Sequence, residues 1–489
     1  MRSPATAARQ RAVRPVSETS DLRRALRCST TEAVFATVHV SLTQGIFLTN
    51  YVIDMGGSNM ICGLVEALPF LTQAAFFVSP ALVRRLNRRK PVVVLFSIAH
   101  RAAWLALIAL LFAPWSPGAR RTLMVLTLLL ANACAVIAGN AWLGWMADLV
   151  PTSIRGAYYG LRNVYLGLTS LVVLFIGSQV LNATGAWPGR RWGYTACFGA
   201  AVISAFVAAF YLSRQYEPPP LPIEPLSWRR IWREPLRNRP FKRFLVFMVV
   251  WQFFLGLAAA FFGVHMVRVL HMTPAQMGYQ AILNSSMALL TTRIWSRPLD
   301  RLGTKAVLLA AGGAVSLHVW LWFGARPGFL WPVWITVIVG GFAWSGFNLA
   351  VFNWPQIMTS PRQRPYALGL LGTASGITFV IGSLLGGLLT TVLPQTLLRI
   401  GSFEFLHYHL LFALSAGGRF CAVLFLATRV PEIGPRGKDP AGALIARTLH
   451  LMLPDRAAAR RGEHDRRRAT YHPGSRTSRP PSAGPPPAS

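Results

Sequence analysis

Charged side chains are scarce in this sequence, and acidic side chains are the scarcest. Asp, Glu, Lys and Arg make up 13% of the 489 residues, whereas hydrophobic residues make up 53%. Soluble domains carry about 25% charged residues, so this chain has too few to cover a surface that faces water. Its 16 acidic residues stand against 49 basic ones, which gives a net charge of +33. Because the basic residues fall between long apolar runs and in the two tails, we expect a membrane protein without a nucleic-acid partner.

Cysteine is also rare, and the motifs of common enzymes are absent. The five cysteines are odd in number and scattered, so they indicate neither a disulfide framework nor a metal site. No phosphate-binding glycine loop and no nucleotide-hydrolysing motif occurs. The first 32 residues are polar and rich in Arg, which excludes a cleavable signal peptide. We therefore expect a protein that is not an enzyme and binds no cofactor or metal.

Long apolar runs dominate what remains. A helix needs about 20 mostly apolar residues to cross the hydrocarbon core of a bilayer. Strands of an outer-membrane barrel would instead show alternation over about ten residues. The sequence therefore predicts an all-α polytopic membrane protein. Its twelve predicted spans cover residues 33–53, 60–81, 92–113, 122–147, 157–181, 194–213, 242–265, 276–295, 306–325, 331–353, 366–392 and 408–428.

The loops between these runs differ in charge. Most Lys and Arg residues lie in the two tails and in alternate loops, and the opposite loops hold few. The positive-inside rule then places both termini in the cytoplasm, for a chain in the cytoplasmic (inner) membrane. The predicted parts are a disordered basic tail (1–32), a six-helix bundle (33–213), a cytoplasmic loop (214–241), a second six-helix bundle (242–428) and a disordered basic tail (429–489). Within the loop, residues 228–233 could lie as a short helix on anionic lipid.

A charged turn lies between the eighth and ninth runs, over residues 295–305. Its only acid is Asp300, followed by Arg301, Gly303 and Lys305. This spacing resembles the cytoplasmic loop signature of the major facilitator superfamily, Gly-x-x-x-Asp-Arg-x-Gly-x-Arg/Lys, with Ser296 in place of the first glycine. The resemblance implies twelve transmembrane helices in two pseudo-symmetric six-helix bundles, with a site at their interface.

A repeat between the two halves supports this resemblance. The loops after the fourth and tenth runs each place an Arg, Arg155 or Arg364, five residues before a Gly-Leu pair with a Tyr between. A second pair of basic loops begins near Arg84 and Asp300. Both pairs lie about 210 residues apart, which predicts duplication of a six-span unit. Such repeats are typical of transporters.

Polar residues within the apolar runs are the candidate substrate contacts. The resemblance places spans one, four, seven and ten around the cavity. A few amides and aromatic faces in an apolar wall suit a small organic molecule. Buried amides also join helices by hydrogen bonds, and a lone histidine is often structural, so both interpretations stay open. The candidates are His39, Gln44, Asn50, Asn140, Trp142, Gln252, Asn284, Trp344 and Asn348.

Two intramembrane charges need partners, because a charge in hydrocarbon costs about 2.5–3.5 kcal/mol on insertion scales. Glu66 lies in the second span and Arg101 in the third. If these spans are antiparallel neighbours, the long Arg101 side chain can reach Glu66. Such a pair could be static, or Glu66 could change its charge when a proton or substrate binds. Both alternatives remain.

The resemblance also implies a cytoplasmic gate. By resemblance, Asp300 meets the start of span five, where the positive helix end attracts a carboxylate. Its predicted partner there is Arg155 or Arg162. The first-half loop has Arg84 where the family usually has its acid, so the matching latch should be weaker. The predicted gate residues are Asp148, Arg155, Arg162, Asp300, Arg301 and Arg364.

These observations predict a secondary active transporter of one small solute. The expected partners are that solute, a coupling ion or proton, and membrane lipids, and the expected state is a monomer. Because few charges line the presumed cavity, export of hydrophobic compounds is favoured over import of sugars or organic acids. The alternative is a protein that keeps the fold but works as a receptor, scaffold or assembly factor.

Overall fold

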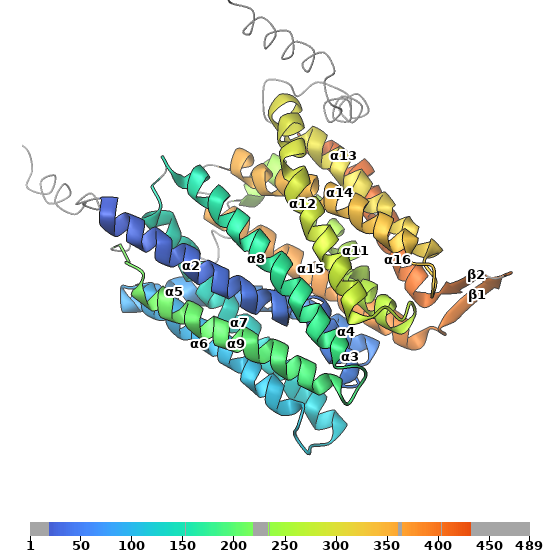
Figure 1. Cartoon of the computed structure of the whole chain (residues 1–489). Coiled ribbons are helices and arrows are strands. Elements are labelled where there is room, and N and C mark those ends of the chain that lie inside the picture. The colour runs from blue at the N-terminus through green and yellow to red at the C-terminus, as the bar shows by residue number, and fades with distance from the viewer. Residues whose placement is uncertain are drawn as a thin grey trace, which may run out of the picture.

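The computed structural model describes residues 19–431, except 152, 219–232, 234, 360–363 and 402. All but the last residue of the predicted helix at 228–233, and most of the two predicted tails, lie outside the described residues. Nearly all of the described residues are helical (Figure 1). The first half contains α2 (Thr19–Thr43), α3 (Ile46–Asp54), α4 (Asn59–Leu71), the 3-10 helix η1 (Thr72–Phe77), α5 (Val78–Leu86), α6 (Lys90–Leu110), α7 (Pro117–Leu149), α8 (Arg155–Ala183) and α9 (Arg190–Arg214).

The second half repeats this all-helical pattern and adds one hairpin. It contains α11 (Arg239–Arg268), α12 (Pro274–Leu302), α13 (Thr304–Leu317), the 3-10 helix η2 (His318–Gly324), α14 (Trp331–Met358), α15 (Arg364–Val392), β1 (Thr396–Ile400), β2 (Phe403–Leu406), α16 (His407–Cys421), η3 (Ala422–Leu426) and η4 (Ala427–Arg429). The antiparallel hairpin β1–β2, with Ile400 opposite Phe403, was not predicted from the sequence.

Helices occupy all twelve predicted spans. Within the described residues, nine are long and apolar enough to cross a membrane by length and composition: α6, α7, α8, α9, α11, α13 with η2, α14, α15 and α16 with its short extensions. The other three predicted spans are α2 with α3, the series α4–η1–α5, and α12. The first of these is broken at Gly45, which has a φ of 56°; glycine adopts this conformation readily because it lacks a Cβ.

The predicted disorder of residues 1–32 is wrong for its last part, because α2 begins at Thr19. Ala25 is buried in an apolar cluster with Trp145 and Leu149 of α7, and Leu22 and Leu26 pack against it. These small and apolar residues recur at helical spacing. One face of the segment is therefore buried, although its other face is rich in arginine.

The charged turn at 295–305 is also shorter than predicted. Helix α12 continues through Asp300 to Leu302, and α13 starts at Thr304. The turn is Gly303, with a φ of 94°. Packing extends the helix, since Trp295 is buried and its indole Nε1 donates a 2.8 Å hydrogen bond to the carbonyl of Phe342.

The two halves touch at one end and diverge at the other. In Figure 1, α8 and α12 lie side by side near α3 and α4 and separate toward the start of α8. One apolar core contains side chains from both halves, such as Phe47, Val65 and Phe261. Toward the end that carries Arg155 and Asp300, the buried clusters belong to one half each. We call the joined end the closed end and the other the basic end.

Candidate functional site

A cavity of about 400 Å³ lies between the two halves. We call it the central cavity. Its walls come from the α2–α3 break, α4, α8, α11 and α12. The polar groups in these walls are Ser41, Gln44, Thr49, Glu66, Ser170, Gln280, Asn284 and Ser285. Amides and hydroxyls in an apolar wall suit a small organic solute, and the sequence predicted Gln44 and Asn284 among them.

The break between α2 and α3 shapes one wall of this cavity. Span one was predicted as a continuous helix, but Gln44 and Gly45 interrupt it and are exposed to the cavity. The amide N–H of Thr49 donates to the carbonyl of Gly45, with a 3.0 Å N–O distance. Discontinuous helices recur at transporter sites because their freed backbone groups can meet a ligand.

Glu66 is the only charged residue among the side chains that line the central cavity. It lies two turns inside the start of α4, deep within the protein, yet it is exposed to the cavity. Within the described residues, its carboxylate forms no hydrogen bond or ion pair. A carboxylate in this position can accept a proton or hold a cationic group.

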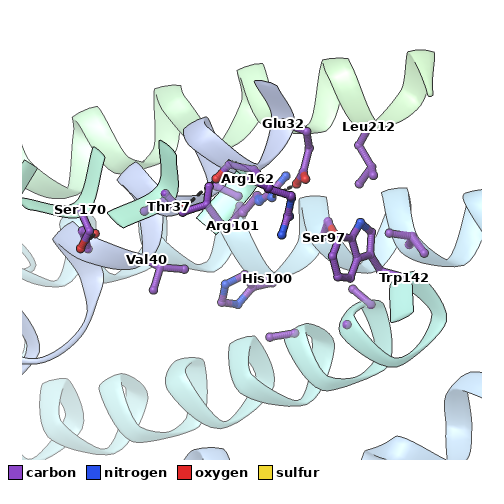
Figure 2. A pocket seen from close by; sticks show the side chains of 18 residues that line it. Glu32, Thr37, Val40, Ser97, His100, Arg101, Trp142, Arg162, Ser170 and Leu212 are labelled. Carbon is purple, nitrogen blue, oxygen red and sulfur yellow. Dashed lines mark hydrogen bonds and ion pairs between the residues drawn. The ribbon is translucent and has the colours of Figure 1, made fainter. Parts of the chain in front are cut away.

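A second cavity, of about 390 Å³, lies within the first half; we call it the inner pocket (Figure 2). Helices α2, α6, α7, α8 and α9 line it. Val40, Ser41 and Ser170 line both cavities. The hydroxyl of Ser41 donates a 3.1 Å hydrogen bond to Oγ of Ser170. The two cavities therefore adjoin at this contact between α2 and α8.

Arg101 pairs with Glu32 in the inner pocket, and the pair with Glu66 considered from the sequence is not formed. The Arg101 Nη2 lies 3.3 Å from the Glu32 Oε1, and Nη1 donates a 3.0 Å hydrogen bond to the carbonyl of Ala205. Both side chains are buried, with 7% and 8% of their surface exposed. Sequence reasoning missed Glu32 because residues 1–32 were assigned to a disordered tail.

Arg162 and Trp142 form a second pair of side chains in the inner pocket. The guanidinium carbon of Arg162 lies 5.0 Å from the centre of the Trp142 ring, which is a cation–π distance. His100 also lines this pocket, and its Nδ1 donates a 2.9 Å hydrogen bond to the carbonyl of Ala131. Trp142 was predicted as a substrate contact and Arg162 as a gate residue, but both lie in this pocket.

Three further predicted contacts in the first half form hydrogen bonds to backbone carbonyls. His39 is buried, its Nδ1 donates to the carbonyl of Ala201 at 3.2 Å, and its ring packs on His100. Asn50 donates to the carbonyl of Ile46 at 2.8 Å. Asn140 donates to the backbone of η1 at 3.0 Å. None of the three lines either cavity, so the structural interpretation fits them better.

The second-half candidates on α11 and α14 also lie away from these two cavities. Trp344 packs against Trp251 and Phe347. Gln252 is half-buried and Asn348 is exposed. The residues that replace them in the central cavity, Ser170, Gln280 and Ser285, were missed. The first lies on α8 and the others on α12, which the sequence did not treat as the main cavity helices.

At the basic end, two of the predicted gate residues, Asp148 and Arg155, bind groups other than Asp300. Asp148 forms an ion pair with the buried Arg89, with a 2.5 Å N–O distance. Arg155 donates to the carbonyls of Ala147 and Val150 at 3.0 and 3.1 Å. Asp300 is exposed, and no ion pair links it to Arg155 or Arg162. The Asp300 latch is therefore not formed in this conformation, in which the basic ends of α8 and α12 are apart.

The closed end is held by contacts across the two halves. Arg268 of α11 donates a 2.7 Å hydrogen bond to Oδ1 of Asn59, which also accepts one of 3.2 Å from the hydroxyl of Tyr408. The hydroxyl of Ser383 donates to the carbonyl of Gly63 at 2.7 Å. Together with the shared core, these bonds join the two halves at this end.

Helix α15 contains two Gly-x-x-x-Gly sequences, at residues 372–376 and 382–386, and three of these glycines allow close packing. A Cβ at Gly382 would lie 2.1 Å from the carbonyl oxygen of Phe253, and one at Gly386 would lie 2.3 Å from that of Leu257. One at Gly376 would lie 3.1 Å from the carbonyl oxygen of Phe70, in the other half. Small residues therefore let α15 approach both α11 and α4.

Comparison with known proteins agrees with this geometry. Residues 33–359 match the family model of the Major Facilitator Superfamily. No curated protein matches the sequence. Among solved structures, a bacterial homologue of the iron transporter ferroportin in an inward-facing state has a TM-score of 0.63 at 13% identity, and the match covers 83% of this chain and 99% of that one. The xylose transporter XylE from E. coli in an inward-open conformation has a TM-score of 0.60 at 14% identity, with 86% and 99% covered.

The nucleoside transporter NupG is similar at a TM-score of 0.59 and 12% identity, with 82% of this chain and 97% of that chain covered. At these identities, the likeness shows the fold alone. The family model matches more than half of the sequence, and the helical fold agrees with it. The chain therefore belongs to the Major Facilitator Superfamily.

Proposed function

We propose that this chain is a secondary active transporter that moves a small organic solute by alternating access. The two halves, residues 19–214 and 239–429, rock around the central cavity as six-helix bundles. One observation carries the proposal: the halves share an apolar core at the closed end but have separate cores at the basic end. A cavity sealed on one side and flanked by separate bundles on the other is what one state of such a cycle requires.

The proposed orientation places the basic end in the cytoplasm. Most loop arginines and lysines lie at that end, as the positive-inside rule demands. The conformation would then be open toward the cytoplasm, like the inward-facing and inward-open structures to which the chain is similar. The protein would be a multi-pass monomer of the cytoplasmic membrane.

Glu66 is the proposed coupling residue, since among the described residues it is the only charged side chain in the central cavity and has no ion-pair or hydrogen-bond partner. A proton bound there would remove its charge during the return step, because an unpaired carboxylate in a closed cavity is costly. Transport would then follow a proton gradient. A wall with a single charge suits largely apolar compounds better than sugars. We therefore favour export of such a compound over import of a sugar.

Proteoliposomes test this proposal and separate it from a receptor, scaffold or assembly role. Purified full-length protein is reconstituted with a proton gradient and a panel of organic solutes, and internal pH is followed. At least one solute should dissipate the gradient with the wild type, and Glu66→Gln should abolish that coupled flux. The control Glu404→Gln, on the exposed hairpin, should not change it. If no solute in the panel produces flux, the non-transporting alternative is favoured.

A further inference from the structure

The inner pocket holds more positive than negative charge. Glu32, Arg101 and Arg162 are the ionic side chains that line it. Glu32 and Arg101 form a buried ion pair at 3.3 Å, so their charges offset each other. Figure 2 shows the Arg162 guanidinium close to this pair. The pocket therefore keeps one positive charge without a carboxylate of its own.

Arg162 also has donors left over. Its Nε is buried and makes no hydrogen bond within the described residues. Its guanidinium rests on the face of Trp142, which orients the group but accepts no conventional hydrogen bond. Arginine presents five N–H donors in a planar fork that matches a carboxylate or phosphate. Arg162 is half-buried, and its buried Nε lacks an acceptor that a carboxylate or phosphate oxygen could supply.

The pocket lies next to the proposed transport route. It adjoins the central cavity at Ser41 and Ser170, and both residues line the two spaces. Its volume of about 390 Å³ is within the range of small-molecule sites. Apart from the charged groups, His100 and a few hydroxyls, its lining is apolar or aromatic. An organic molecule with one oxyanion group fits this combination.

We propose that the inner pocket binds an oxyanion, a carboxylate or a phosphate group, carried by the transported solute. Arg162 is its main ligand, and Arg101 is a second ligand whose strength is reduced by Glu32. The inference rests on the proposed transport function and narrows its solute to a largely apolar compound that carries one oxyanion group. The inner pocket supplies positive charge for an anion. The wall of the central cavity supplies none, because Glu66 is its only charged residue.

Direct binding tests this site without requiring transport. The full chain is placed in phosphatidylcholine nanodiscs, and binding of benzoate, inorganic phosphate and the neutral benzamide is measured at equilibrium. Benzoate or phosphate should bind saturably, and benzamide at least about tenfold more weakly. Arg162→Gln should weaken anion binding about tenfold, because it removes charge-assisted hydrogen bonds. Arg162→Lys keeps the charge but loses the planar fork of donors. Its affinity for the anion should lie between that of the wild type and that of Arg162→Gln.

Two further variants separate a ligand role from a purely structural one. Arg155→Gln is the matched control, since it lies on the same helix but donates only to the carbonyls of Ala147 and Val150. It should bind as the wild type does. Glu32→Gln should bind the anion more tightly, because Arg101 loses its competing carboxylate. If Arg162→Gln matches the control, or if neither anion binds, the anion site is refuted.

Nanodiscs that contain phosphatidylglycerol distinguish a solute from a lipid headgroup. If this lipid leaves benzoate and phosphate binding at Arg162 intact, a free anion is the occupant, as proposed. If it abolishes that binding, the headgroup occupies the pocket and the assignment to a solute is wrong. Failure of flux in proteoliposomes with intact anion binding would instead reject transport and leave the anion site standing.

Discussion

Gly278 lets α12 approach α8 at the closed end, and adding one methyl group there should open it. A Cβ at Gly278 would lie 2.2 Å from the Oγ and 2.3 Å from the Cβ of Ser178, whereas ordinary contacts are 3.4–4 Å. The helices must therefore separate in Gly278→Ala. Overpacking of this kind costs about 1–3 kcal/mol. Because the cost falls only on states with a closed end, the equilibrium should shift about 5- to 150-fold toward the opposite state.

Reaction of a single cysteine in the central cavity measures this shift. Gln280→Cys, in a chain whose natural cysteines are replaced, is labelled in sealed vesicles by an impermeant reagent on the side of the closed end. Gly278→Ala should raise the rate about tenfold, and adding Ser178→Gly should restore it because the clashing atoms are gone. Gly199→Ala is the control, since a Cβ there meets nothing within 4 Å. An unchanged or slower rate in Gly278→Ala would refute the reasoning.

Three further predictions concern charged side chains. Arg101→Gln leaves Glu32 buried without its ion-pair partner and should lower the free energy of unfolding by about 3–5 kcal/mol. Thermal melting should show that adding Glu32→Gln restores part of this stability. An Arg101→Gln variant as stable as the wild type would contradict the prediction. Arg268→Ala removes a 2.7 Å hydrogen bond to Asn59, which is worth about 1.5–3 kcal/mol. The cavity cysteine should then be labelled about tenfold faster from the closed-end side. An unchanged rate would show that this contact does not hold the closed end. Asp300→Asn removes the latch predicted for the state closed at the basic end, so the same labelling should slow; faster labelling would show that the latch has the opposite effect.

The sequence predicted the all-helical membrane fold and the order of its apolar segments but not the ends of the helices. Composition and length determine which segments can cross a membrane, so the twelve runs all became helices. Helix ends depend on packing that composition does not reveal. Leu22 and Ala25 extend α2 because α7 covers them. Asp300 lies in α12 because the buried Trp295 extends that helix past the expected turn.

The cavity residues were predicted less completely, for a related reason. Gln44 and Asn284 were identified because amides in apolar runs are unusual. Glu32 was overlooked since it preceded the first apolar run, although an acid is a rare residue in this chain. His39 looked equally suitable, but only the neighbouring carbonyl and rings show that it packs within its own half. Which face of a helix meets a cavity is set by tertiary contacts, not by the spacing along one helix.

Distances from α8 to α12, or to the loop that immediately precedes α12, test the alternating motion most directly when they are measured at both ends. Spin labels at Ala183→Cys and His271→Cys report the closed end, and labels at Gly156→Cys and Arg297→Cys report the basic end; all four positions are exposed. Distance distributions are measured by pulsed electron resonance in nanodiscs across pH and with a solute that produces flux. Alternating access predicts a second population in which the closed-end distance lengthens and the basic-end distance shortens in the same proportion of molecules. A fixed distance at both ends under every condition, or lengthening at both ends together, would contradict it.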